Sequence, residues 1–188
     1  MTEHTNTTRL IGGALKAVGA GGLVGVAIIA PNTLQAFERF GIFAPSTPKA
    51  RRNRLLAELK RQGLILAEQN GDTIHLRLTV KGIHRLQRVE IDELEIKPQK
   101  HWDKTWRMVM FDIPARRRES RYILTSQLRR LGFVMVQQSL WVHPYPCFDI
   151  VQQVVAYANL QQFVSIAEII RLDESSTKRL LRHYPNLH

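Results

Sequence analysis

The sequence predicts an α+β protein of two domains, and three observations carry this prediction. Its 188 residues exceed one average domain, because single domains cluster near about 100 to 150 residues. Helical and strand patterns alternate along a chain with a globular composition, 44% hydrophobic and 23% charged. Residues 91–104 are polar, with Pro98 in their middle, which predicts a linker between a domain at 1–90 and another at 105–188.

The first apolar stretch, residues 10–30, has about the length of a bilayer span. It contains six glycines and the charged Lys16, which make insertion unfavourable. A membrane anchor or an export signal is the alternative interpretation. We expect a buried first helix in a cytoplasmic protein, packed closely against Leu55 and Leu59.

The remaining elements of the first domain follow in order. Leu34, Phe37 and Phe40 stand at helical spacing and predict a second helix over 32–41. A third helix over 48–62 carries an apolar stripe and a basic opposite face. Two strands over 64–66 and 73–78, around Asn70-Gly71, predict a β-hairpin, and Thr79 caps a closing helix. Three helices followed by a hairpin are the order of a winged helix-turn-helix.

The second domain alternates strands and helices in the order βαββαβ, which is that of a ferredoxin-like sandwich. A final short helix follows it. The predicted strands are 106–111, 133–136, 140–143 and 163–170, and the predicted helices are 114–131, 148–160 and 174–182.

The chain is strongly basic in both halves. Twenty-seven Lys and Arg stand against 16 Asp and Glu, a formal net charge of +11, which indicates a polyanionic partner such as nucleic acid. The single Cys147 cannot form an intramolecular disulfide, and the seven histidines without a CxxC motif exclude a zinc finger.

Several runs of the second domain resemble the central domain of PaaX-type repressors, the regulators of phenylacetate degradation genes. These runs are Trp102 to Pro114, Arg116-Arg117-Arg118, Leu131-Gly132-Phe133, Gln138 to Val142 and Tyr145-Pro146. In that family this domain resembles the second Cas protein, the small ferredoxin-fold subunit of CRISPR adaptation, and a winged helix precedes it. The resemblance implies a dimer and a short form of the family, and the ligand response of the full-length repressors is not carried over to this chain.

The role of Asp112 distinguishes a binding protein from an enzyme. It stands where the resembling CRISPR subunit has the aspartate proposed to hold a divalent metal across a dimer, so the resemblance makes Asp112 a candidate catalytic residue and Mg²⁺ ligand. The other interpretation, which we favour, is that Asp112 caps the helix that follows Pro114. His143 is expected to be a strand-end residue, and Ser139 a turn hydroxyl, rather than catalytic groups.

The sequence therefore predicts a repressor-like transcriptional regulator that binds double-stranded DNA, dimerises through its second domain and needs no cofactor. Two alternatives stay open: a Mg²⁺-dependent nuclease that uses Asp112, and a non-catalytic subunit of a CRISPR-type adaptation complex with its partner. The candidate DNA contacts are Lys49, Arg51, Arg52, Arg54, Lys60, Arg61, His75, Arg77, Arg116 and Arg117.

Overall fold

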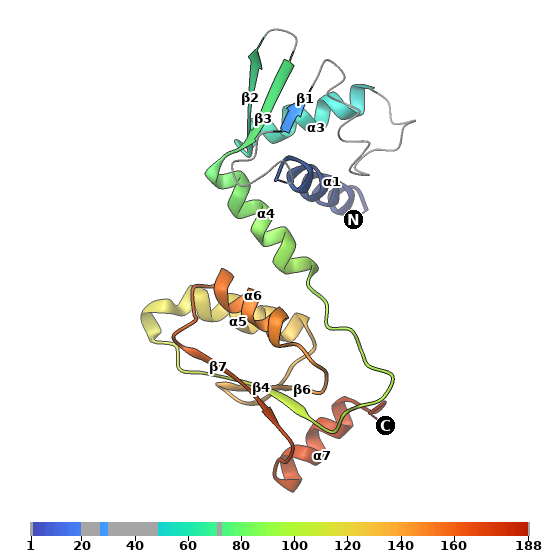
Figure 1. Ribbon diagram of the computed structural model, residues 1–188, viewed down its shortest axis with the longest axis vertical. Coiled ribbons are helices and arrows are strands. Elements are labelled where there is room, and N and C mark those ends of the chain that lie inside the picture. Colours follow the sequence, from blue (N-terminus) through green and yellow to red (C-terminus); the bar gives the residue numbers. More distant parts are fainter. Residues whose placement is uncertain (1, 20–26, 30–48, 71–72, 188) are drawn as a thin grey trace. The chain divides into compact units, whose positions relative to one another are not determined.

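The computed structural model describes residues 2–19, 27–29, 49–70 and 73–187 (Figure 1). The chain divides into two compact units, Met1–Glu90 and Ile91–His188, which are described separately. Both units combine helices with a small sheet, so the protein is of the mixed α and β class. None of the described helices is both long and apolar enough to cross a membrane.

The first unit has a three-stranded antiparallel sheet with the strand order β1-β3-β2. Its elements are α1 (Thr2–Gly19), β1 (Ala27–Ile29), α3 (Lys49–Arg61), β2 (Ile65–Asn70), β3 (Thr73–Leu78) and α4 (Val80–Glu93). The third helix, both hairpin strands and the closing helix are thus where the sequence predicts them, although β2 runs on to Asn70. The predicted helix over 32–41 lies outside the described residues.

The predicted single helix over 10–30 is wrong at residues 27–29, which form a strand. Helix α1 begins at Thr2 and ends at Gly19, and β1 pairs with β3 in the register Ala27↔Leu76 to Ile29↔Ile74. Glycines and the β-branched pair Ile28-Ile29 lower the helix propensity of this stretch, and an available edge of β3 favours a strand. The first half, residues 10–19, is a largely buried helix as predicted.

The core of the first unit joins α1 to α3 and to the sheet. Leu15, Val18, Leu59 and Leu76 are each at most 1% exposed within this cluster. Glycines of α1 allow close contact with α4 rather than with α3, since a Cβ at Gly19 would lie 2.7 Å from Leu86 Cδ2. Burial of one face of α3 in this core leaves the opposite face exposed to solvent.

The start of α4 is capped as the sequence predicts. The Gly82 backbone N–H donates to Thr79 Oγ1 at 3.0 Å, and Thr79 Oγ1 donates to the Gly63 carbonyl at 2.6 Å. Position 82 must be glycine at this contact, because a Cβ there would lie 2.0 Å from the Leu64 carbonyl oxygen. The first turn of α4 therefore packs directly on the backbone that enters β2.

The second unit contains a four-stranded sheet of order β5-β6-β4-β7 in which every neighbouring pair is antiparallel. All four strands and the helices between them are found within a few residues of their predicted bounds. The elements are β4 (Trp106–Phe111), η1 (Ala115–Arg117), α5 (Arg118–Arg130), β5 (Val134–Gln137), β6 (Leu140–His143), α6 (Phe148–Tyr157), β7 (Val164–Ile169) and α7 (Glu174–His183).

Both faces of this sheet are covered (Figure 1). Val109 and Trp141 pack with α5 and α6 in the main core, whereas Trp106 and Val142 pack with Leu180 of α7 on the other face. Side chains of β4 and β6 therefore pack into two different cores, because successive side chains of a strand point to opposite faces of the sheet. Helix α7, for which the sequence suggests no role, covers the second face.

Residues that the sequence assigns to the linker are partly bound to α5. Helix α4 continues to Glu93, and no helix or strand follows it before β4 in this described stretch. Arg130 donates hydrogen bonds of 2.9 Å to the carbonyls of Ile91 and Leu94, and Gln127 Nε2 donates to the Asp92 carboxylate at 2.7 Å. The beginning of the predicted linker is thus attached to the second unit.

Candidate nucleic-acid interface

The exposed face of α3 brings together three of the predicted DNA-binding residues. Leu55 and Leu59 point into the core, so the positions on the other side of the helix face solvent. This surface, which we call the α3 face, consists of Ala50, Asn53, Arg54, Ala57, Lys60 and Arg61.

Two cations of the α3 face, Arg54 and Lys60, are not neutralised by any of the described residues. In the part of the chain that the structure describes, Arg54 and Lys60 have no hydrogen-bond or ion-pair partner. Arg61 differs, because its Nε and Nη2 donate to the Glu58 carboxylate at 2.8 and 2.6 Å. These hydrogen bonds, with one from Gln62, lower the pKa of Glu58 to about 2. Arg54 and Lys60 therefore supply the unpaired positive charge of this face.

Asn53 belongs to the same surface, although it is not among the DNA contacts that the sequence predicts. It is an uncharged side chain on the exposed side of α3, beside Arg54 and between the small residues Ala50 and Ala57. Its spacing from Ala57 and Lys60, four and seven positions along the helix, was a readable signal. The positions of Lys and Arg in the sequence do not indicate Asn53, because its side chain is uncharged.

The other candidates of the first unit are less completely placed. Lys49, Arg51 and Arg52 lie in the first turn of α3, and their side chains are outside the described set. On β3, Arg77 is exposed and His75 is half-buried, and the register sets the acidic Glu68 opposite His75. Arg77 is thus the exposed cation among the described side chains of the hairpin.

Arg116 and Arg117 have different environments on the second unit. Arg116 is exposed, whereas Arg117 Nη1 donates to the Asn159 carbonyl at 3.2 Å and its guanidinium lies 5.1 Å from the centre of the Phe163 ring. Arg117 therefore attaches η1 to the segment between α6 and β7. The Arg117 side chain is thus engaged in contacts within the second unit.

The interpretation of Asp112 as a helix cap is wrong. The N-cap positions of η1 and α5 are Pro114 and Arg117, and neither helix start has a side-chain cap. Asp112 precedes the N-cap residue Pro114 by two positions, and its backbone N–H donates to the Phe163 carbonyl at 3.0 Å. Its carboxylate is exposed and, in the described portion of the chain, has no partner.

His143 and Ser139, the other two residues weighed as catalytic groups, differ in burial: His143 is buried and Ser139 is exposed. His143 is 5% exposed at the end of β6, and burial lowers its pKa to about 4. Ser139 lies in the turn between β5 and β6, where its carbonyl accepts from Phe111. Among the described residues, no group of three His, Cys, Asp or Glu side chains could hold a metal ion.

The fold and these surfaces define a basic protein of two α and β units, with an exposed cationic helix in the first and a four-stranded antiparallel sheet in the second. Residues 99–181 match the family model of the PaaX protein central Cas2-like domain. This stretch belongs to that domain family, and the resemblance seen in the sequence is confirmed there. No curated protein matches the chain.

Proposed function

We propose that this protein is a DNA-binding transcriptional regulator that inserts α3 into the major groove. The observation that carries the proposal is the α3 face, where Arg54 and Lys60 have no protein partner among the described residues. The PaaX-type domain at 99–181 supports this proposal, since the PaaX family suggests a transcriptional regulator.

The order of elements in the first unit supports a winged helix-turn-helix. In such domains a recognition helix precedes a hairpin, and here α3 precedes β2 and β3, with β1 added to the free side of β3. The 13 residues of α3 span about 20 Å at 1.5 Å per residue, and a major groove about 12 Å wide admits such a helix.

Residue chemistry on the α3 face suits base reading as well as phosphate binding. An arginine can donate two hydrogen bonds to guanine and an asparagine can pair with adenine, so Arg54 and Asn53 are the proposed base contacts. Ala50 and Ala57 let the helix approach the bases closely, and Ala57 can contact a thymine methyl group. Lys60 is the proposed phosphate contact.

The test is duplex DNA binding by the full chain, followed by fluorescence anisotropy over a range of salt concentrations. The variant Arg54→Ala/Lys60→Ala should lose about 1 to 3 kcal/mol of binding free energy per contact, and its salt slope should fall by about 0.9 per lost phosphate contact. The matched control is Arg171→Ala/Arg182→Ala, two exposed arginines of the second unit with the same change in charge. Equal affinity and slope in both variants would refute the assigned face.

A separate experiment tests whether Asn53 contacts a base. Duplexes selected from a random pool by the wild type should lose preference at one or more positions when Asn53→Ala is used, because a mismatched contact costs about 1 to 3 kcal/mol. Binding to unselected DNA should change little, since Asn53 carries no charge. An unchanged selected sequence would remove Asn53 from the proposal.

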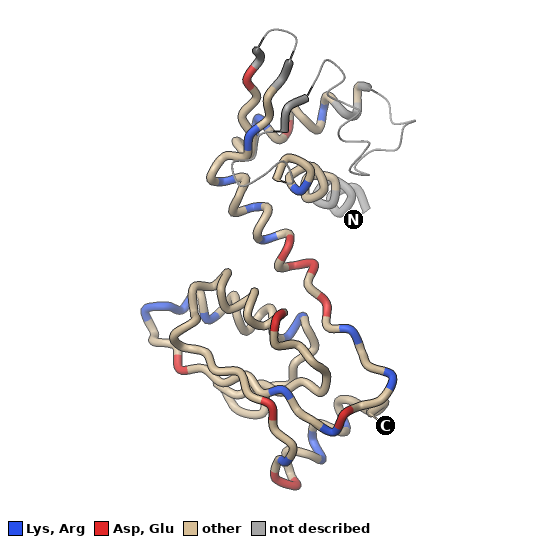
Figure 2. The backbone as a smooth tube through the Cα atoms, viewed as in Figure 1, with Lys and Arg blue, Asp and Glu red and all other residues tan. Residues whose placement is uncertain are grey.

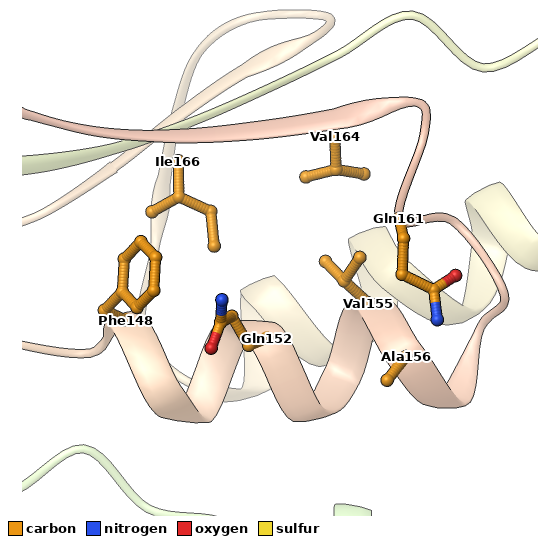
Figure 3. Close-up of a pocket in the computed structure, with 7 residues that line it drawn as sticks. All are labelled: Phe148, Gln152, Val155, Ala156, Gln161, Val164 and Ile166. Carbon is orange, nitrogen blue, oxygen red and sulfur yellow. The ribbon is translucent and has the colours of Figure 1, made fainter.

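We also propose that the second unit is a ferredoxin-like sandwich through which two copies dimerise. Its strand order supports this fold. The edge strand β7 is the proposed interface, because Arg179 of α7 already donates to the Met135 and Val136 carbonyls of the other edge strand, β5. Beside β7 lies an open groove of about 430 Å³, into which Val164 and Ile166 point from the strand and Phe148 from α6 (Figure 3).

Sedimentation of the full chain tests this interface. The variant Ile166→Asp places a charge in the groove and should convert a dimer to a monomer at micromolar concentration, whereas Leu181→Asp, on the exposed side of α7, should not. A wild-type monomer at tens of micromolar, or a dimer that survives Ile166→Asp, would refute the interface.

The nuclease alternative has less support. One chain offers Asp112 as a lone carboxylate near arginines, and the described residues do not assemble a metal site around it. A non-catalytic role in an adaptation complex is distinguished from both by a co-purifying partner protein.

A further inference from the structure

A cleft lies at the start of α5, and its lining residues do not belong to the α3 face. It has a volume of about 410 Å³, in the range of small-molecule sites. Its lining residues come from the segment between β4 and α5 and from the first turns of α5: Ile113, Pro114, Ala115, Arg118, Arg121, Tyr122 and Thr125.

One side of this cleft is cationic. Arg118 and Arg121 are three positions apart on α5, so they lie on the same side of the helix, and both are exposed. Arg118 has no hydrogen-bond or ion-pair partner in the described part of the chain, and Arg121 contacts only the Phe111 ring, at 5.7 Å. Figure 2 shows Lys and Arg gathered where the chain enters α5. Positive charge near a helix N-terminus is unfavourable, and a bound anion would offset it.

The same cleft also has an apolar part of its lining. Tyr122 is 69% exposed, which is unusual for a large aromatic side chain, and it lies four positions after Arg118 on the same side of α5. Ile113 is buried beneath the cleft, and Pro114 and Ala115 add apolar surface. The Thr125 hydroxyl is already used, because it donates to the Arg121 carbonyl at 3.0 Å. An aromatic ring beside apolar surface suits a planar ring system.

We infer that this cleft binds a nucleotide unit, with the phosphate between Arg118 and Arg121 and the base stacked on Tyr122. A simple inorganic anion would use the two guanidinium groups but would leave the aromatic ring and most of the 410 Å³ unfilled. A neutral aromatic compound would leave the unpaired Arg118 without a counter-charge. The same chemistry has two sources, a free mononucleotide or one nucleotide of a single strand.

The experiment uses the full chain and isothermal titration with AMP, adenosine, ribose 5-phosphate and inorganic phosphate, and anisotropy with a short labelled oligothymidine strand. AMP should bind more tightly than either of its parts. Arg118→Gln/Arg121→Gln should reduce AMP affinity about tenfold or more, because two charge-assisted contacts are lost. Arg171→Gln/Arg182→Gln, with the same change in charge at exposed sites elsewhere, should not.

Tyr122→Ala separates stacking from charge. It should abolish the advantage of AMP over ribose 5-phosphate and leave phosphate binding unchanged, since stacking on an aromatic side chain changes affinity about 5- to 100-fold per base. Stronger binding of the strand than of AMP, lost in the same variants, assigns the site to a strand; equal binding assigns it to a free nucleotide.

Two outcomes would overturn the inference: no binding of AMP or of the strand by the wild type, or binding that the Arg118/Arg121 and Tyr122 variants retain. The variant Arg54→Ala/Lys60→Ala keeps this cleft intact and should bind AMP normally. A failure of the cleft and a failure of the proposed DNA interface are therefore distinguishable.

Discussion

His143 should make the stability of the second unit depend on pH between about 6.5 and about 4. The ring lies among Phe133, Tyr145 and Tyr184, with ring centroids 5.0 to 5.9 Å away, and Nδ1 accepts the Tyr145 backbone N–H at 3.1 Å. Burial lowers its pKa from 6.5 to about 4, the Tyr145 backbone opposes this shift, and the positive charge of Arg107 reinforces it. The folded protein therefore keeps His143 neutral.

The sign and size of the effect follow from the two pKa values. Because the folded pKa is lower, the unfolded chain takes up the proton first, so stability is full above pH 6.5 and falls until the pH reaches about 4. Each pH unit in this window costs about 1.4 kcal/mol. From about pH 7.5 to about pH 5.0, His143 alone should remove about 2 kcal/mol of unfolding free energy.

Urea unfolding of the wild type and of His143→Asn at these two pH values measures the effect. Asparagine keeps an acceptor near the position of Nδ1 and does not titrate, so the variant is less stable at both pH values but loses about 2 kcal/mol less than the wild type on acidification. Comparing the two pH slopes removes the cost of the smaller side chain. Parallel slopes would show that His143 is protonated in the folded protein as readily as in the unfolded one, and would refute the argument.

Four further substitutions test contacts elsewhere. Gly82→Ala should cost at least about 2 kcal/mol in urea unfolding despite the better helix propensity of alanine, because its Cβ would meet the Leu64 carbonyl at 2.0 Å. Gly63→Ala, at φ +66° with open space around it, should cost about 1 to 2 kcal/mol, and the reverse ranking would contradict the packing described. Arg107→Ala should cost about 2 to 4 kcal/mol, since this buried guanidinium binds two carboxylates and two carbonyls; a loss under about 1 kcal/mol would refute its structural role. Asp112→Asn should leave the thermal midpoint unchanged with or without Mg²⁺, because its carboxylate has no partner among the described residues; Mg²⁺-dependent DNA cleavage by the wild type that this variant abolishes would favour the nuclease.

Local patterns in the sequence determined most of the secondary structure. The bounds of β4 and β6 are those predicted, because alternation in a strand and the turn residues beside it depend on neighbours in the chain. The Thr79 cap and the positive φ of Gly132, which ends α5, follow from local chemistry in the same way. The basic face of α3 was also readable, since helical spacing separates Arg54 from Leu55.

Tertiary structure decided what depends on residues distant in the chain. β1 exists through its pairing with β3, nearly fifty positions later, and a short apolar segment rich in glycine carries no local signal for that pairing. The helix after β4 has its N-cap at Pro114 and no side-chain cap, although the position of Asp112 before Pro114 predicted one, and the Asp112 backbone N–H instead pairs with the distant Phe163 carbonyl. The cleft beside Tyr122 likewise needs β4, η1 and α5 to be folded together. Propensity and spacing act over a few residues, whereas pairing, burial and the shape of a cleft are set by which segments meet, and a single sequence does not encode those meetings locally.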